Sequence, residues 1–312
     1  MIRLGLCCTF QQEPIKFRTT TAAYLTRIDK PYSHLGTIIE HNILSLQQAL
    51  YFCAQNGIGA FRINSQILPL CSHPDWKYEI QDLPNNSQIT TLLSTCLQLK
   101  KHLDVRLLMH PDQFVVLNSP KADVVKNSIA ELNYQATFAG LVGVDVINIH
   151  GGGVYGNKLE ALARFKSHFL SLPENIKKLL TVENDDKCYT PEDLLPVCEE
   201  LQIPLVYDVH HHRCLKDSLS IQAATTAALK TWNRESVFHI SSPIGGWDST
   251  KIRQHHDFIE PTDFPKCWEN LHNTTIEVEA KSKEVAVQAL QKFLKEKHIK
   301  IWLNNSKKNP SF

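Results

Sequence analysis

Pro204-Leu205-Val206-Tyr207-Asp208-Val209-His210-His211-His212 is the segment from which the rest of the chain can be interpreted. Its apolar half is typical of a short buried strand, and a carboxylate and three imidazoles follow where that strand ends. Asp208 and His211 are three positions apart, so both can point into one cavity from a tight turn, whereas His210 and His212 need not. The pattern favours a metal site at a strand end. A histidine-rich polar loop is the alternative.

The same arrangement recurs along the chain as an alternation of strand-like and helix-like segments. The predicted strands cover 3–8, 58–63, 105–109, 144–149, 179–182, 204–207, 236–238 and 274–278. Eight such alternations predict an α/β protein with a single parallel (β/α)8 barrel, whose active site lies at the C-terminal ends of the strands. A doubly wound open sheet is the alternative. The glycine cluster 151–153 lacks the Gly-Lys-Ser/Thr ending of a nucleotide-binding loop, so we expect no nucleotide cofactor.

The predicted domain organisation is simple. Residues 1–298 form the barrel and 299–312 a C-terminal tail with little periodicity. Residues 9–36, which are polar and contain two prolines, are expected to be a long loop that could cover a site. The helix over 37–56 then has apolar residues at helical spacing and ends at Gly57.

Composition limits the class of protein. The 312 residues are 43% hydrophobic, which supports a substantial core, and 33 basic against 32 acidic side chains give a charge of +1. Any binding to nucleic acid must therefore come from a local face. Nine cysteines without a Cys-x-x-Cys pair argue against a disulfide framework, and no apolar run is long enough to span a bilayer. We expect a monomer in the reducing cytoplasm, with no membrane association.

Candidate ligands follow almost every predicted strand. A single one, such as His110, would more often be a structural histidine. Burying several imidazoles and carboxylates at one barrel mouth is costly unless cations compensate their charge. Ligation without thiolates suits manganese or zinc, and the number of ligands exceeds the need of one ion, which predicts a cluster of two or three. Such clusters hydrolyse phosphate esters. The set is His110, His150, Glu183, Asp208, His211, His239 and Glu279.

On these residues the chain resembles the UV damage endonucleases of the UvdE/UvsE type, relatives of the endonuclease IV barrel. The resemblance covers nearly everything from Arg3 to Leu294. Its most specific segments are Phe61-Arg62-Ile63-Asn64-Ser65, His110-Pro111-Asp112-Gln113-Phe114, Asn148-Ile149-His150-Gly151-Gly152-Gly153, Glu183-Asn184-Asp185, Asp208-Val209-His210-His211, His239-Ile240-Ser241, His255-His256-Asp257-Phe258-Ile259 and Glu279-Ala280-Lys281.

The resemblance implies a metal-dependent DNA repair endonuclease. Such an enzyme nicks damaged double-stranded DNA immediately 5′ to cyclobutane pyrimidine dimers and 6-4 photoproducts and so initiates excision repair. The resemblance adds His255 to the ligands, selects His211 over its neighbours, and favours Mn²⁺ over Zn²⁺ or Mg²⁺. It assigns catalysis to His73, Glu183 and Glu279 and lesion binding to Gln113, Phe114 and Arg62, because an aromatic ring and an amide suit a wedge in opened DNA.

Two residues of this chain differ from those that the family commonly has, and three other functions are possible interpretations of the sequence. Val237 stands where relatives often carry a lysine that can be carboxylated, and Leu6 stands where they commonly have a tyrosine. An abasic-site endonuclease of the endonuclease IV type, a metal-dependent sugar isomerase and a damage-binding protein without activity are the alternative functions. Phe114 could also be an ordinary core residue, together with the apolar residues 115–117.

Overall fold

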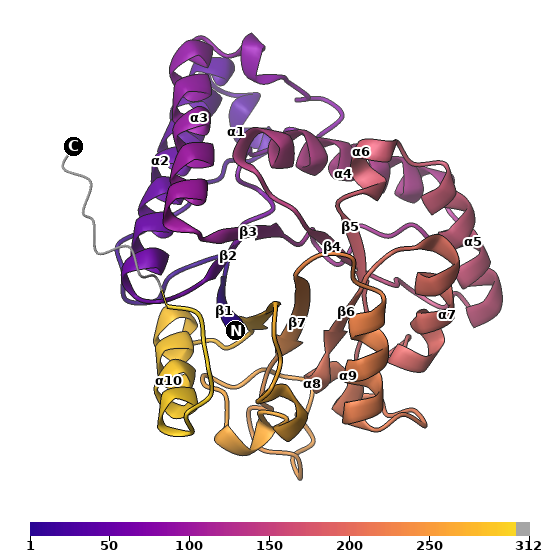
Figure 1. The fold of residues 1–312 in the computed structure, drawn as a ribbon. Coiled ribbons are helices and arrows are strands. Elements are labelled where there is room, and N and C mark those ends of the chain that lie inside the picture. The colour runs from indigo at the N-terminus through magenta and orange to yellow at the C-terminus, as the bar shows by residue number, and fades with distance from the viewer. Residues whose placement is uncertain (304–312) are drawn as a thin grey trace.

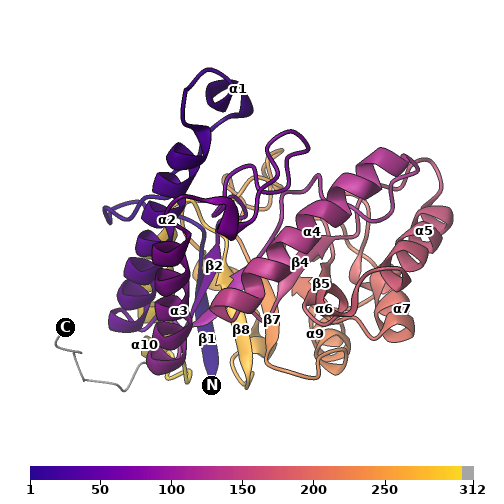
Figure 2. The same ribbon diagram turned by 90° about the horizontal axis from the view of Figure 1, so that it is seen from above.

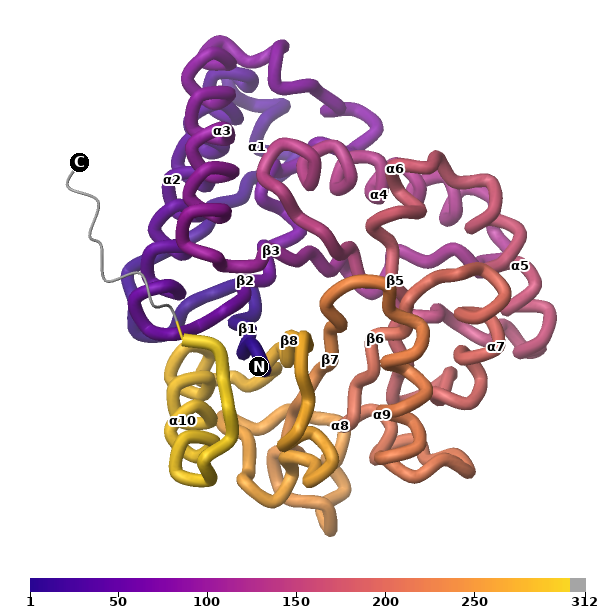
Figure 3. The backbone as a smooth tube through the Cα atoms, viewed as in Figure 1, coloured from indigo at the N-terminus to yellow at the C-terminus, as the bar shows by residue number. Residues whose placement is uncertain are grey.

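The computed structural model describes residues 1–303, and it shows a closed barrel of eight parallel strands (Figure 1). The strands follow one another around the barrel in chain order, and the backbone tube in Figure 3 shows the same ring. The predicted (β/α)8 barrel is therefore confirmed. Its strands are β1 Ile2–Cys7, β2 Ala60–Ile63, β3 Arg106–Met109, β4 Ile147–His150, β5 Leu180–Glu183, β6 Leu205–Asp208, β7 Ser236–Ile240 and β8 Thr274–Val278.

Helices surround this ring and cover its outer face (Figures 1 and 2). They are α1 Ala22–Leu25, α2 Pro31–Gln55, α3 Asn86–Leu103, α4 Ala122–Val142, α5 Lys158–Leu170, α6 Glu174–Lys177, α7 Pro191–Leu201, α8 Val209–Cys214, α9 Ile221–Lys230 and α10 Lys283–Glu296, with short 3-10 helices η1 Ile80–Asp82, η2 Pro261–Asp263 and η3 Lys266–Trp268. Within residues 1–303, no helix combines the length and apolar composition that crossing a membrane requires.

The barrel interior contains an apolar layer directly beneath the predicted site. Leu108, Val206 and Val237 belong to one small buried cluster, and each precedes a predicted ligand by two positions. Because strand side chains alternate between two faces, each ligand stands above one of these apolar residues. These three apolar residues therefore close the site from below on the side of β3, β6 and β7.

The loop predicted over 9–36 is shorter in the structure. Helix α2 begins at Pro31 rather than at residue 37, because proline is favoured at the first position of a helix. The short helix α1 also lies within the predicted loop, at the barrel end opposite the N-terminus (Figure 2). Residues 8–21 remain irregular between β1 and α1.

The segment after α10 returns to the start of β1. Ile301 forms a parallel bridge with Ile2, and the indole N–H of Trp302 donates to Asp104 Oδ2 at 2.9 Å. This part of the predicted tail is thus packed against the barrel. Residues 304–312 lie outside the described residues, so the predicted domain boundary at 298 stays a prediction.

Candidate metal centre

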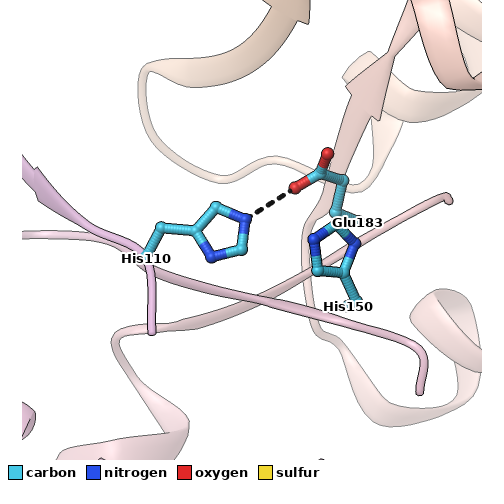
Figure 4. A group of neighbouring side chains, drawn as sticks. All are labelled: His110, His150 and Glu183. Atoms are coloured by element: carbon cyan, nitrogen blue, oxygen red, sulfur yellow. Dashed lines mark hydrogen bonds and ion pairs between the residues drawn. The ribbon is translucent and has the colours of Figure 1, made fainter. Parts of the chain in front are cut away.

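Six of the predicted ligands lie on or next to the carboxyl ends of β3 to β8. One group of potential ligand atoms joins His110, His150 and Glu183, and another joins Glu183, Asp208 and His239. Within each group the atoms lie within 4.8 Å of one another. Figure 4 shows the rings of His110 and His150 next to the Glu183 carboxylate, with a dashed line from His110 to one of its oxygens. Glu183 belongs to both groups, so it lies at the centre of the cluster.

The two oxygens of Glu183 face different imidazoles. Oε2 lies 3.1 Å from Nε2 of His110, whereas Oε1 lies 3.2 Å from Nδ1 of both His211 and His239. The side-chain amide of Asn148 donates to Oε2 at 2.5 Å, and Thr181 donates to Asn148 Oδ1 at 3.0 Å. Glu183 is thus fixed from below and presents both oxygens to the cluster.

Asp208 is held by the start of helix α8. The backbone N–H of His211 donates to Asp208 Oδ1 at 2.7 Å, which makes Asp208 the N-cap of this helix. The side chain of Asn184 accepts a hydrogen bond from the backbone N–H of Asp208 and donates one to the backbone carbonyl of Asp208. The other carboxylate oxygen, Oδ2, is buried, has no hydrogen-bond partner in the described part of the chain, and lies 4.0 Å from His239 Nδ1. The helix therefore occupies one oxygen and leaves the second facing the cluster.

Glu279 contacts two of the predicted histidine ligands and Arg62. Its Oε1 lies 3.4 Å from His239 Nδ1 and its Oε2 lies 3.9 Å from His255 Nδ1. Nη1 of Arg62 donates to Glu279 Oε1 at 2.6 Å. All eight predicted ligands are therefore brought together, with His255 at the outer edge. Arg62 points into the barrel in this arrangement, and its predicted contact with DNA stays a prediction.

Backbone carbonyls fix the proton position in two of the histidines. Nδ1 of His110 lies 3.0 Å from the carbonyl of Pro111, and Nδ1 of His211 lies 3.0 Å from the carbonyl of Asn184. A carbonyl can only accept, so in the neutral ring Nδ1 carries the proton and Nε2 is free to bind a cation. This is the usual arrangement of histidines that ligate metals.

The buried polar atoms fit a group of cations. His150 Nδ1, Asp208 Oδ2 and His239 Nδ1 are buried and have no hydrogen-bond partner among residues 1–303. Such atoms are costly unless something pairs with them, and a divalent ion bound by imidazole and carboxylate does so. The arrangement supports metal binding at this mouth of the barrel.

The histidines of the cluster differ in the direction in which their pKa values are shifted. Burial lowers the pKa of His150 to about 4, although Glu183 opposes this. For His211 and His239 burial acts in the same direction, but the neighbouring carboxylates outweigh it and raise both pKa values well above the ordinary value. Burial would raise the pKa of Glu183, yet His239 and His150 hold it well below its usual range. Without a metal, His150 is therefore neutral at neutral pH, whereas His211 and His239 are positively charged, with a proton on both ring nitrogens.

Metal binding should consequently release protons. His211 and His239, whose pKa values are raised, must lose protons to bind a cation, so affinity should increase as the pH rises through those values. Titration of metal-free protein with Mn²⁺ by calorimetry, in two buffers of different ionisation enthalpy, measures the released protons directly. Binding without proton release, or affinity that falls as pH rises, would contradict these protonation states.

The neighbours of His211 have other partners. His212 Nδ1 lies 2.7 Å from the hydroxyl of Tyr207, and its Nε2 lies 2.9 Å from Asp217 Oδ1. His210 is buried between Trp247 and His255, with ring centroids 5.3 Å from each. The tight turn expected after the strand is instead the first turn of helix α8, which directs successive side chains to different faces.

This difference gives a test within one short helix. Replacing His212 with Ala should lower the free energy of unfolding by about 1–3 kcal/mol, because the buried Tyr207 hydroxyl and Asp217 lose a partner. Metal content should stay at the wild-type level. Replacing His211 with Ala should instead reduce the metal content. Thermal unfolding and elemental analysis of both variants measure these effects. Loss of metal from His212→Ala with full metal content in His211→Ala would contradict the assignment.

The predicted lesion-binding pair lies outside this cluster. Gln113 and Phe114 are in the loop after β3, and 76% of Phe114 is exposed. The alternative that Phe114 belongs to the core is therefore wrong. Phe114 lines a cavity of about 800 Å³ together with Asp112 and His73. His73 Nδ1 accepts the N–H of Asp75 at 3.2 Å, which leaves its Nε2–H as a donor. His73 thus lies beside the exposed pair, on the loop after β2.

Sequence reasoning missed two buried residues that touch the ligands. Asn148 holds Glu183, and Glu277 lies 2.8 Å from His239. Glu277 and Glu279 are two positions apart on one strand, so they share a face, and this spacing was the available signal. The two residues that differ from those common in the family are both buried. Val237 belongs to the apolar layer of the barrel, and Leu6 lies in the core.

The fold and this site define a class: a (β/α)8-barrel enzyme with a cluster of metal-binding side chains at the C-terminal ends of its strands. A family model described as UV-endonuclease UvdE matches residues 2–305. The chain therefore belongs to the UvdE family of UV endonucleases.

Individual relatives agree with the family model. The chain is 34% identical over 304 residues to a UV DNA damage endonuclease from Nostoc sp., covering 92% of this chain and 89% of the relative. It is 31% identical over 298 residues to one from Bacillus velezensis, covering 91% and 89%.

Solved structures show the same similarity in three dimensions. The crystal structure of SacUVDE superposes with a TM-score of 0.86 at 29% identity, covering 96% of this chain and 100% of that one. Endonuclease IV from Thermus thermophilus has a TM-score of 0.59 at 14% identity, covering 94% and 99%, which shows a shared fold alone.

Proposed function

We propose that this protein is a metal-dependent DNA repair endonuclease that nicks the backbone immediately 5′ to UV photoproducts. Its substrate would be double-stranded DNA containing a cyclobutane pyrimidine dimer or a 6-4 photoproduct, and the nick would initiate excision repair. Membership of the UvdE family supports the substrate. The eight side chains gathered at the barrel mouth support a cluster of two or three divalent ions, with Mn²⁺ as the first candidate.

The observation that carries the proposal is the position of Glu183. Its two oxygens face separate groups of imidazoles, so Glu183 would help to hold cations together with His110 on one side and with His211 and His239 on the other. Bound ions would supply a hydroxide at neutral pH and neutralise the leaving oxygen of a phosphodiester. The protein's own part is to hold Glu183 through Asn148 and to balance the charge of Glu279 with Arg62.

Lesion recognition would fall to the exposed pair next to the site. Gln113 and Phe114 would enter the duplex at the lesion, where a photoproduct is already poorly stacked and opening costs less than in intact DNA. His73, on the same cavity, would donate from Nε2 to the scissile phosphate. One barrel, proposed over residues 1–298, supplies all these groups, so we propose that the protein acts as a monomer in the cytoplasm.

A comparison of defined duplexes tests this function. Three end-labelled duplexes of one sequence would carry a single pyrimidine dimer, a single abasic site or no lesion. After chelation the protein should cut none of them, and with Mn²⁺ restored it should cut the dimer duplex once, immediately 5′ to the lesion. Cleavage of the abasic duplex alone would identify an abasic-site endonuclease, and binding without cleavage would identify a damage-binding protein.

Binding should weaken steeply with salt. The net charge is only +1, so affinity must come from a limited face with exposed cations such as Lys16, Arg18, Lys251 and Arg253. Each phosphate contact releases counterions, so the logarithm of the binding constant should fall linearly with that of the salt concentration, by about 0.9 per contact. Fluorescence anisotropy over a range of NaCl concentrations measures this slope. A slope near zero would exclude a charged interface.

A further inference from the structure

Glu277 is a buried carboxylate directly beneath the candidate metal centre. It lies on β8, only 1% exposed, and its backbone pairs with His239 on one side and with Gly5 on the other. Two positions further along the strand is Glu279, one of the predicted ligands. Since alternate strand residues share a face, both carboxylates point into the barrel. Glu277 therefore occupies the layer below the ligands.

The neighbouring strands leave space for this side chain. A Cβ atom at Gly5 would lie 3.3 Å from Glu277 Cγ and 3.5 Å from Ala60 Cβ. The first distance is tight, so a larger residue at position 5 would push the carboxylate. Gly5 and Ala60 are small, and the space that larger side chains would take at these positions is occupied by the Glu277 side chain.

Glu277 faces a ligand and a cation at once. Its Oε2 lies 2.8 Å from His239 Nε2 and 3.5 Å from Arg62 Nη1. The two atoms are at ion-pair distance, although their contact does not have the geometry of a hydrogen bond. A lone pair on Nε2 would repel the carboxylate at this distance. Carboxylates also face Nδ1, but a cation held by Glu183 and Glu279 would take that side of the ring, so the one proton of the neutral ring would stay on Nε2 beside Glu277.

In His239, as in His110 and His211, an acceptor faces one ring nitrogen and leaves the other for a cation. The nitrogen that faces the acceptor is Nε2 in His239 and Nδ1 in the other two. In His110 and His211 a backbone carbonyl holds the proton on Nδ1. No carbonyl does this for His239 within residues 1–303, and Glu277 is the group that faces its outer nitrogen. Nη1 of Arg62 lies 3.5 Å from Glu277 and 2.6 Å from Glu279, so one positive charge is shared between two buried carboxylates, each of which requires a cationic partner.

We propose that Glu277 is a positioning residue of the metal centre. It holds His239 in the tautomer that presents Nδ1 to the cation, and through Arg62 it holds Glu279. The inference rests on the proposed metal-dependent function of the same site. The competing explanation is that Glu277 only stabilises the barrel by its ion pair with Arg62.

A matched pair of variants separates the two explanations. Glu277→Gln removes the charge but little volume. Glu235→Gln is the control, because Glu235 is also a partly buried carboxylate paired with arginine, 3.1 Å from Arg3, but its partners lie at the opposite end of the barrel. Affinity for Mn²⁺ alone is measured by calorimetry on the full chain. The long-range ¹H–¹⁵N spectrum of the Zn²⁺-loaded protein, assigned with His239→Gln, reports the tautomer of His239.

The proposal requires Glu277→Gln to bind Mn²⁺ about 10–100-fold more weakly and to change the His239 signals, while Glu235→Gln keeps both at the wild-type values. Equal affinities and unchanged His239 signals in Glu277→Gln would overturn it. If that variant does not fold, Gly5→Ala, which displaces Glu277, should show a loss towards the lower end of that range, and wild-type affinity there would also overturn it. Wild-type protein that binds no Mn²⁺ would refute the proposed function and the inference together.

Discussion

Glu183→Gln should abolish nicking while the barrel stays folded. The variant keeps the shape of the side chain but removes the charge that faces His110 on one side and His211 and His239 on the other. Losing a ligand should cost more than the about 10–100-fold that follows loss of an outer partner. Initial rates of cleavage on a dimer duplex, with metal content by elemental analysis, measure the effect.

The control for this variant is again Glu235→Gln, which removes a carboxylate from an arginine pair far from the mouth. It should nick at the wild-type rate even if its melting temperature falls. A folded Glu183→Gln protein with full metal content and near wild-type activity would remove Glu183 from the centre of the site.

The double replacement Gln113→Ala with Phe114→Ala should remove most of the preference for damaged DNA. Both side chains are exposed, so truncation leaves the core and the metal ligands intact. Base stacking on an aromatic ring is worth about 1–3 kcal/mol per base, so affinity for the lesion should fall towards that for intact duplex. Competition binding between irradiated and intact duplexes of one sequence measures the ratio.

Leu170→Ala is the matched control for the exposed pair. Leu170 is 62% exposed at the end of α5, away from the predicted site, so its truncation removes a comparable apolar surface. Metal content and melting temperature should match the wild type in both proteins. If the double variant still discriminates as the wild type does, recognition lies in other residues.

Much of the fold could be predicted because the strands are apolar runs separated by amphipathic helices. The strand ends were less predictable. His150, Glu183, Asp208 and His239 were expected just after their strands, and in the structure they are strand residues that take part in the ladder. Ladder hydrogen bonds use the backbone, so a polar side chain at the mouth does not end a strand. Helix α2 begins earlier than the sequence predicted because Pro31 occupies its first turn, where proline is favoured.

The side chains that gather at the site could also be predicted, because parallel strands bring their carboxyl ends to one rim. Contacts across strands could not. Glu277 meets His239 because β7 and β8 pair in that register, and Asn148 reaches Glu183 because β4 and β5 do. Likewise, helix α8 turns His212 towards Tyr207 and Asp217. Sequence spacing shows which residues share a face, whereas register decides which of them touch.

In the proposed function, cleavage of DNA beside a photoproduct requires cations held by the side chains at this mouth of the barrel. Stepwise addition of Mn²⁺ to chelated protein, with bound ions and nicking followed in the same samples on a duplex with one labelled dimer, tests it most directly. We predict that activity appears only as two or three ions bind, and that the single product ends immediately 5′ to the dimer. Cleavage by the metal-free protein, or a metal-loaded protein that leaves the dimer duplex intact, would contradict the account.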